Sequence, residues 1–211
     1  MTVEELIVYG KGKTSSDHAK MLLSSYLDVN PLELLTILDK EVDSDIEKIY
    51  KSSLDALKEN KPIQYVIGNV NFYGLKFIVN KNVLIPRFET EELVEQVVEY
   101  AKSLNKDKIK ILDLGCGSGA ISVSLSKELG VAVDAVDISS DAIIVAKENC
   151  VKNGASVNFY LGNMLDPLHD KYDVIISNPP YISHDEDIDD VVRDNEPHIA
   201  LFADNDGLYF Y

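Results

Sequence analysis

The stretch Asp113-Leu-Gly115-Cys-Gly117-Ser-Gly119 decides the fold of this 211-residue chain. It follows a short apolar run, residues 109–114, and it opens a segment, residues 120–129, that is typical of a helix. Glycine lets the backbone turn sharply and come close to a ligand, because no Cβ stands between them. Ligands of open parallel sheets bind at such loops, at the carboxyl ends of the strands. The stretch therefore predicts a strand, a ligand-binding loop and a helix.

The segments around this loop predict an α/β domain. Apolar strands are expected at residues 109–114, 131–136, 157–161 and 172–177. Helices are expected from about Glu89, at residues 120–129 and at residues 141–153. Continuous apolar strands that alternate with helices are typical of a parallel sheet covered on both faces. We therefore predict a Rossmann-like domain over residues 84–211.

The first 61 residues predict a small helical bundle, because their apolar residues recur at helical spacing. Capping signals at residues 30–33 and 44–47, with Ser44 as the second cap, mark two helix starts. Residues 62–83 are expected to form a β-hairpin linker. Its strands are placed at residues 64–67 and 75–79, joined through Tyr73-Gly74.

Composition limits the function classes. The chain has 45% hydrophobic and 27% charged residues, which is typical of a globular protein. It contains no long apolar run and no basic, apolar leader, so neither a membrane span nor a signal peptide is expected. Two cysteines without a C-x-x-C motif suit the cytoplasm. The net charge is −16, and residues after Val83 carry 10 basic and 24 acidic side chains, net −14. Such a charge argues against direct binding of nucleic acid.

The spacing of the glycines indicates which nucleoside binds. Asp137 ends the second predicted strand, 18 residues after Gly119, where its carboxylate can accept hydrogen bonds from ribose hydroxyls. The spacing is Gly-x-Gly-x-Gly instead of the dinucleotide pattern Gly-x-Gly-x-x-Gly. Asp113 suits a ligand with a positively charged amino group better than a pyrophosphate. This favours S-adenosylmethionine, with NAD and a glycine turn without ligand as alternatives.

The tetrapeptide Asn178-Pro179-Pro180-Tyr181 follows the last predicted strand and so lies at the same edge of the sheet. Taken alone it is an ordinary turn. Next to a methyl donor, the Asn178 side-chain oxygen and the Pro179 carbonyl can accept both hydrogens of a planar –NH2 group, and Tyr181 can stack on it. The tetrapeptide therefore predicts methylation of an amide or exocyclic amine nitrogen.

Three further stretches carry a family resemblance. They are residues 63–68 with Phe72-Tyr-Gly-Leu75, the segment Leu84-Ile-Pro-Arg87-Phe-Glu-Thr-Glu91, and Asn195-Glu-Pro197 with Ala200-Leu201. With the glycine loop and the tetrapeptide, they make the chain resemble the HemK/PrmC family. These enzymes are protein-(glutamine-N5) methyltransferases that act on the Gly-Gly-Gln loop of class 1 peptide chain release factors. The resemblance implies S-adenosyl-L-methionine as cofactor and a release factor as partner, with no direct nucleic acid and no membrane.

The resemblance also implies roles for single residues. The expected cofactor-binding residues, including Asp113 from the argument above, are Asp113, Gly115, Cys116, Gly117, Ser118, Gly119, Asp137, Asn163, Met164, Asn178 and Arg87. The expected substrate-binding residues are Asn178, Pro179, Pro180 and Tyr181, of which Asn178, Pro179 and Tyr181 are expected to be catalytic.

Two of these assignments depart from the family or stay open. The chain has Gly162-Asn163-Met164 where the family often has Ser-Asp or Gly-Asp, so an amide would replace a carboxylate at the adenine amine. Arg87 and Thr90 would help to close the cofactor site. Alternatively, they are a surface arginine and a helix cap.

The family's catalytic domain has a seven-stranded sheet, and this chain ends in the helix that precedes the fifth strand. We therefore expect a truncated domain whose strand at residues 172–177 is an unprotected edge. Such a domain is expected to be less stable than the full fold and to self-associate.

Other functions stay open. One alternative is a DNA adenine-N6 or cytosine-N4 methyltransferase, which uses the same –NH2 chemistry. Another is a truncated, inactive fragment that only binds the cofactor or a partner.

A calcium-loop register, Asp185, Asp187, Asp189 and Glu196, has Asp190 where glycine is required. The four histidines lack metal spacing, so no metal is expected.

Overall fold

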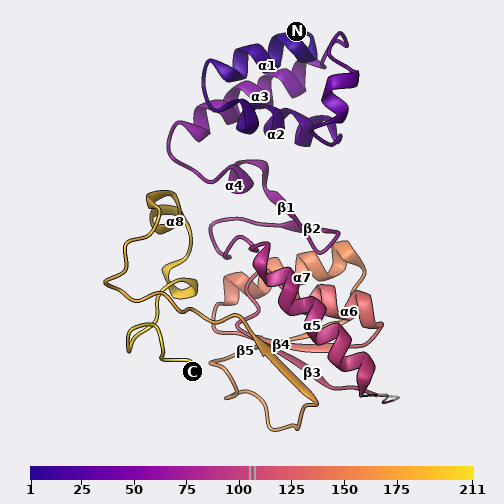
Figure 1. Ribbon diagram of the computed structural model, residues 1–211, viewed down its shortest axis with the longest axis vertical. Coiled ribbons are helices and arrows are strands. Elements are labelled where there is room, and N and C mark those ends of the chain that lie inside the picture. Colours follow the sequence, from indigo (N-terminus) through magenta and orange to yellow (C-terminus); the bar gives the residue numbers. More distant parts are fainter. Residues whose placement is uncertain (105, 107) are drawn as a thin grey trace. The chain divides into compact units, whose positions relative to one another are not determined.

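The computed structural model describes residues 1–104, 106 and 108–211. Contacts divide the chain into two compact units, Met1–Gly68 and Asn69–Tyr211, which are coloured from indigo to purple and from purple to yellow in Figure 1. No helix within the described residues is both long enough and apolar enough to pass through a bilayer.

The first unit is helical, as predicted. Its elements are α1 (Val3–Lys11), α2 (Ser16–Leu27), the 3-10 turn η1 (Glu33–Thr36), α3 (Ser44–Leu57) and α4 (Ile63–Ile67). Their apolar faces meet in one core, in which Tyr50 of α3 is fully buried. The Tyr50 hydroxyl lies 3.2 Å from the carbonyl oxygen of Leu6 and 3.3 Å from that of Ala19. This side chain thereby links three helices.

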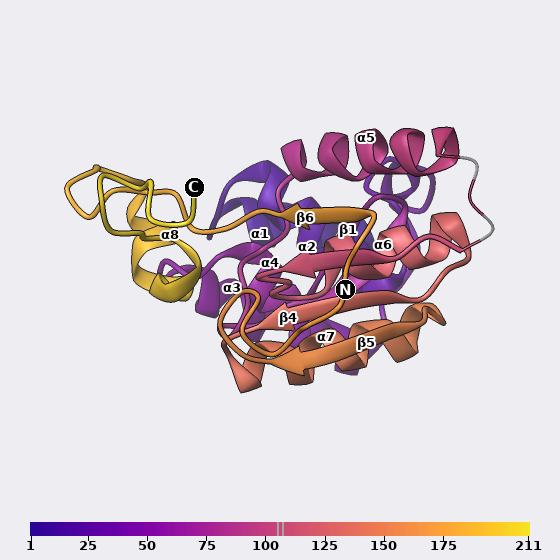
Figure 2. The same cartoon turned by 90° about the horizontal axis from the view of Figure 1, so that it is seen from below.

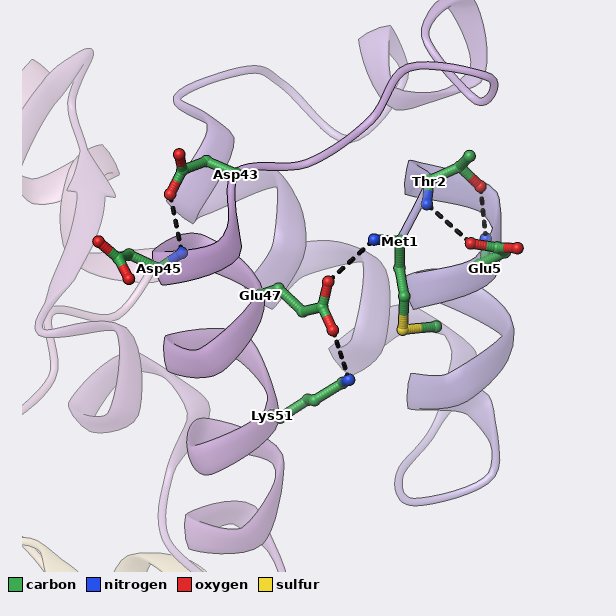
Figure 3. Close-up of polar contacts among 7 residues, drawn as sticks. All are labelled: Met1, Thr2, Glu5, Asp43, Asp45, Glu47 and Lys51. Atoms are coloured by element: carbon green, nitrogen blue, oxygen red, sulfur yellow. Dashed lines mark hydrogen bonds and ion pairs between the residues drawn. The ribbon is translucent and has the colours of Figure 1, made fainter.

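Capping side chains fix where α1 and α3 begin (Figure 3). Thr2 accepts a hydrogen bond from the N–H of Glu5, and the Glu5 carboxylate accepts one from the N–H of Thr2. Asp43 caps α3 by accepting from the N–H of Asp45. The prediction of Ser44 as this cap was one residue late. Asp43 has the extended ψ of a cap residue, whereas Ser44 is already helical.

The other carboxylates of the predicted capping signals differ in what they do. Glu47 binds the α-amino group of Met1 at 2.9 Å and the Lys51 ammonium at 2.6 Å, so it does not complete a capping box (Figure 3). Glu33 does accept from the N–H of Asn30 at 3.0 Å, and the Asn30 side chain accepts from the N–H of Glu33. This reciprocal pair opens the single turn η1, not a longer helix.

The prediction of a strand at residues 64–67 was wrong, because these residues belong to helix α4. Its composition of Ile, Tyr and Val suits a strand, but Ile63, Val66 and Ile67 share the spacing of one helix face and pack on the first unit's core. Gly68, with φ of 82°, ends this short helix in the left-handed region. Tertiary packing therefore overrides the local preference for a strand.

The second unit begins with a hairpin of β1 (Asn69–Phe72) and β2 (Leu75–Ile78). Tyr73 and Gly74 both have positive φ, which is the backbone of a tight two-residue hairpin turn. The predicted turn is therefore confirmed. The rings of Phe72 and Phe77 pack edge to face and join the core of the second unit.

A parallel sheet of four strands forms the centre of the second unit, which confirms the predicted α/β class. The strands are β3 (Ile111–Leu114), β4 (Val133–Asp137), β5 (Val157–Leu161) and β6 (Val174–Ser177), and Figure 2 shows them side by side in the order β5-β4-β3-β6. Among the described strands, β6 pairs only with β3, and its Ile175 is exposed.

The two faces of the sheet are covered differently. Helices α5 (Glu89–Ser103), α6 (Ala120–Leu129) and α7 (Ser140–Asn153) lie on one side of it in Figure 1. The segment 162–173 covers the other side, where Met164, Leu168 and Tyr172 pack on the buried side chains of β3 and β4. Both faces are therefore covered, as predicted, but one of them by a loop.

The strand order places a crevice at the carboxyl ends of β3 and β6. From β3 the chain proceeds to β4 and β5 on one side, and β6 returns to the other side of β3. Loops that leave β3 and β6 therefore diverge, and ligands of such sheets bind between them. After β6 the chain forms α8 (Asp190–Asn195) and η2 (His198–Ala200), and it ends near this edge of the sheet.

Candidate functional site

The glycine loop is shaped by two glycines with different tasks. Gly117 has φ of 53°, and a Cβ built on it would meet no atom within 4 Å, so the backbone there borders open space. Gly119 has φ of 77°, and a Cβ on it would lie 3.1 Å from the Cβ of Ala146. The loop therefore leaves room for a ligand at Gly117, and at Gly119 it lets α6 pack closely on α7.

Asp137 holds the glycine loop from the end of the neighbouring strand. Its two carboxylate oxygens accept hydrogen bonds from the N–H of Gly117 at 2.7 Å and the N–H of Ser139 at 2.8 Å. Burial raises the pKa of this carboxyl, while the backbone donors act in the opposite direction. Each oxygen keeps a lone pair beyond these bonds, so the carboxylate can also accept from ligand hydroxyls.

A pocket lies above this loop, and we call it the glycine-loop pocket. Six residues predicted to bind the cofactor line it: Gly115, Gly117, Asp137, Asn163, Met164 and Asn178. Sequence reasoning missed the apolar part of its wall, which includes Leu84, Ile138, Ile199, Ala200 and Phe210. Ile138 could have been found from the sequence, because it is the apolar residue that directly follows Asp137. The other four residues come from distant segments, so no local pattern connects them with the loop.

Three of the predicted cofactor residues belong to the glycine loop but do not line the pocket. Ser118 is buried, and its carbonyl accepts from the side chain of Asn149 at 2.9 Å. Cys116 is buried as well, and burial raises the pKa of its thiol, which makes it a poor nucleophile. Gly119 begins α6. These three residues form the buried side of the loop.

Asp113 is the second buried acid of the loop region, after Asp137, and has an unusual environment. Its side chain is fully buried, and one oxygen accepts from the N–H of Ser122 in the first turn of α6 at 3.1 Å. Its other oxygen has no hydrogen-bond partner among the described residues. Burial raises the pKa of this carboxyl to about 7. A direct contact with a ligand's amino group stays a prediction.

A second pocket borders the tetrapeptide, and we call it the Asn-Pro-Pro pocket. Its lining includes Asn178, Pro179 and Tyr181, three of the four residues expected to bind the substrate, whereas Pro180 lines the glycine-loop pocket instead. The side-chain amide of Asn178 donates to the hydroxyl of Thr90 at 3.4 Å. This bond points the Asn178 nitrogen toward α5 and leaves its oxygen as the free acceptor.

Thr90 and Arg87, for which two roles were left open, both line the Asn-Pro-Pro pocket. Thr90 is not a helix cap, because α5 begins one residue earlier, at Glu89, after the cap residue Phe88. Arg87 lines the Asn-Pro-Pro pocket and not the glycine-loop pocket, and its guanidinium pairs with Glu196 at 2.6 Å. Glu196 was not among the predicted site residues, and no signal in the sequence connects it with Arg87.

The two pockets meet at three residues. Leu84, Asn178 and Ala200 line both of them. A ligand in the glycine-loop pocket and a second ligand in the Asn-Pro-Pro pocket would therefore touch the same side chains. Asn178 is the polar member of this group. The arrangement can bring a group carried by one ligand to an atom of the other.

The residues of the glycine-loop pocket fit S-adenosylmethionine. Asp137 suits ribose hydroxyls, and the exposed side chain of Ile138 and the thioether of Met164 offer apolar surface to a planar base. Asp113 precedes the first glycine of the loop, and its carboxyl, when ionised, adds negative potential for a positively charged ligand. Open space at Gly117 lets the ligand approach the backbone.

Two family models match the chain. A methyltransferase small domain matches residues 90–195, and a PrmC N-terminal domain matches residues 10–68. The release factor glutamine methyltransferase of Bacillus subtilis is 43% identical over 201 residues, which cover 92% of this chain and 70% of that protein. The release factor glutamine methyltransferase of Flavobacterium psychrophilum is 41% identical over 198 residues, covering 90% and 70%.

Among solved structures, the Pyrococcus abyssi tRNA (uracil-54, C5)-methyltransferase in complex with S-adenosyl-L-homocysteine matches 53% of this chain and 28% of its own. The TM-score is 0.45 and the sequence identity 23%.

Proposed function

The chain belongs to the release factor glutamine methyltransferase family, and we propose that it methylates the side-chain nitrogen of a glutamine in peptide chain release factors. The glutamine would be that of the Gly-Gly-Gln loop, as the resemblance of the sequence implies. The cofactor is S-adenosylmethionine, which supplies a methyl group on a positively charged sulfur. We further propose that the reaction takes place in the cytoplasm.

The observation that carries the proposal is the position of Asn178, which lines both pockets. Thr90 accepts from its side-chain nitrogen, so its side-chain oxygen is left to accept one hydrogen of the substrate amide. The Pro179 carbonyl, which accepts no hydrogen bond from another described residue, is available for the second. Prolines on either side of the peptide bond keep this carbonyl rigid.

This geometry answers the chemical difficulty of methylating an amide. The nitrogen of an amide is a poor nucleophile, because its lone pair is delocalised into the carbonyl group. Hydrogen bonds from both of its hydrogens to the Asn178 oxygen and the Pro179 carbonyl favour a pyramidal nitrogen and aim the lone pair at the glycine-loop pocket. The proton can leave during or after transfer, so no strong base is required. Positioning therefore supplies most of the catalysis.

A protein substrate suits the charge of this unit better than a nucleic acid. Residues after Val83 carry a net charge of −14, which repels a phosphate backbone. The acidic side chain of Glu89 lines the Asn-Pro-Pro pocket itself. A DNA amino-methyltransferase would need to draw a base out of a polyanionic duplex into that pocket. We therefore favour the release factor.

The test is a labelling experiment with the 211-residue chain and S-adenosylmethionine that carries a labelled methyl group. The substrates are a class 1 release factor, the same factor with its Gly-Gly-Gln glutamine replaced by alanine, and duplex DNA. We expect label only in the unmodified factor. Label in DNA would contradict the proposal, and so would equal labelling of both factors. Binding of the cofactor without label anywhere would favour a fragment that only binds.

A further inference from the structure

Glu196 is a buried carboxylate that is tied to a distant segment by both of its oxygens. Its side chain is 1% exposed. One oxygen accepts from the backbone N–H of Ile85 at 3.0 Å, and the other pairs with the guanidinium of Arg87 at 2.6 Å. These partners lie 111 and 109 residues earlier in the chain. Glu196 therefore fixes the segment before α5 against the segment after α8.

Both of these segments form pocket walls. On one side of the carboxylate, Leu84 lines both pockets and Arg87 lines the Asn-Pro-Pro pocket. On the other side, Val192 lines the Asn-Pro-Pro pocket and Ala200 lines both. Leu84 and Ala200 are two of the three residues at which the pockets meet, and Asn178 is the third. The bonds of Glu196 thus connect the two walls that flank Asn178.

The bonding pattern favours a fixed position for these walls. A carboxylate removed from water is costly unless its oxygens are satisfied, and here a backbone donor and a guanidinium satisfy one oxygen each. The backbone bond sets the position of Ile85, and with it that of the adjoining Leu84. Arg87 is partly exposed, so its charge is screened and the buried carboxylate is the fixed end of the pair.

We propose that Glu196 is a positioning residue that sets the width of the passage between the two pockets, through Leu84 and Ala200. Because it holds the two walls around Asn178, it aligns an amide in the Asn-Pro-Pro pocket with the ligand of the glycine-loop pocket. The inference rests on the proposed function for its consequence in catalysis. Its structural part, a fixed passage, does not depend on which substrate is methylated.

The first experiment compares Glu196→Gln with the wild-type chain. The amide keeps an acceptor for the N–H of Ile85 but turns an N–H2 group toward Arg87, so the pair is lost. A displacement of about 1 Å can cost a factor of about 10² in rate. We therefore expect kcat for the release factor to fall by roughly 10 to 100-fold. KM and the Kd of S-adenosylhomocysteine, measured by calorimetry, should change by less than about 3-fold.

Two control variants separate positioning from other effects. Glu186→Gln makes the same change of charge at an exposed site of the same loop region and should leave kcat unchanged. Ser126→Ala removes two hydrogen bonds with Ser156, at the far end of α6, and should lower Tm without lowering kcat below the melting temperature. If Glu196→Gln leaves kcat unchanged, or lowers it only as much as Ser126→Ala at a matched loss of Tm, positioning is refuted.

A second measurement needs no methylated substrate. Hydrogen exchange at the N–H of Ile85 and across residues 198–201 should be faster in Glu196→Gln, with and without S-adenosylhomocysteine. If exchange there is unchanged, the inference fails. A wild-type chain that labels no release factor contradicts the proposed function, and the exchange result still decides the role of Glu196.

Should Glu196→Gln not fold, Arg87→Gln is expected to lower kcat and Arg87→Lys, which keeps a partner for Glu196, to retain most of it.

Discussion

The polar contacts of the glycine-loop pocket and of the Asn-Pro-Pro pocket differ in how far apart their partners lie along the chain. In the first, Gly117 and Asp137 are 20 residues apart and belong to neighbouring strand ends. In the second, Thr90 and Asn178 are 88 residues apart, and Arg87 and Glu196 are 109. The contact that holds the glycine loop therefore follows from one local pattern of strand, loop and helix, whereas the apolar wall of this pocket comes from distant segments. The second pocket depends on tertiary contacts between segments that carry no common pattern.

The comparison predicts that the pockets can be damaged separately, and the largest effect is expected from Asn178→Ala. It removes the acceptor for the substrate amide while leaving the glycine loop intact. Loss of one preorganised hydrogen-bonding group at a reacting centre costs roughly 10²–10³ in kcat. We expect a loss of this size in steady-state methylation of the release factor. The Kd of S-adenosylhomocysteine should rise by less than about 10-fold. Equal losses in both quantities would mean that Asn178 belongs mainly to the cofactor site.

Asp137→Asn is expected to have a smaller effect of the opposite kind: it should weaken cofactor binding more than it lowers kcat. The carboxylate accepts from two backbone N–H groups, and an amide offers only one oxygen for them. Hydrogen bonds to a charged group contribute about 1.5–3 kcal/mol, so the Kd of S-adenosylhomocysteine should rise by roughly 10 to 100-fold. At saturating cofactor, kcat should fall much less. Calorimetry measures this Kd, and saturation kinetics measure kcat. A lower kcat with an unchanged Kd would contradict the assignment of Asp137 to the cofactor site.

The same difference in sequence separation explains what could be predicted from the sequence. The helix predicted at residues 120–129 and the strand at 157–161 are present with those bounds, as α6 and β5. Their apolar patterns are bounded by glycine or polar residues on both sides. Residues 64–67 misled the prediction, because burial against the first unit's core decided their conformation. Glu196 stood in the family-like stretch 195–197 and in the calcium-loop register, but its contacts could not be predicted, since its partners lie more than 100 residues away.

Asp113 gives a pH-dependent test of the glycine loop. Its folded pKa, about 7, is above that of an ordinary carboxyl, 3.8, so the folded state binds the proton more tightly than the unfolded state. The contribution of Asp113 to stability is therefore lost as pH rises from about 4 to about 7, and the loss is complete above 7. Asp113→Asn keeps an acceptor for Ser122 and cannot ionise. Its Tm should exceed that of the wild type by a few degrees more at pH 8 than at pH 5.

Melting curves at both pH values check this expectation. Asp134→Asn is the matched control, because its carboxylate lies on the same sheet in a part-buried bond with Tyr172 and shows no comparable burial. It should give no such increase in the difference between pH 5 and pH 8. If the Tm difference between Asp113→Asn and the wild type is the same at both values, the Asp113 carboxyl is ionised throughout that range.

The smallest effect is expected at Tyr181, which tests whether the Asn-Pro-Pro pocket uses the face of this ring or its hydroxyl. The side chain is 60% exposed, so its hydroxyl is free to bond with water. If the ring stacks on the planar amide, Tyr181→Phe keeps the contact and should change kcat/KM by less than about 2-fold. Tyr181→Ala removes a stacking contact of about 0.5–1.5 kcal/mol, which corresponds to a loss of roughly 2 to 12-fold. A loss in Tyr181→Phe as large as in Tyr181→Ala would assign the role to the hydroxyl. Tyr181 is expected to contribute less than Asn178, because its ring is exposed whereas a hydrogen bond to Thr90 orients the Asn178 side chain.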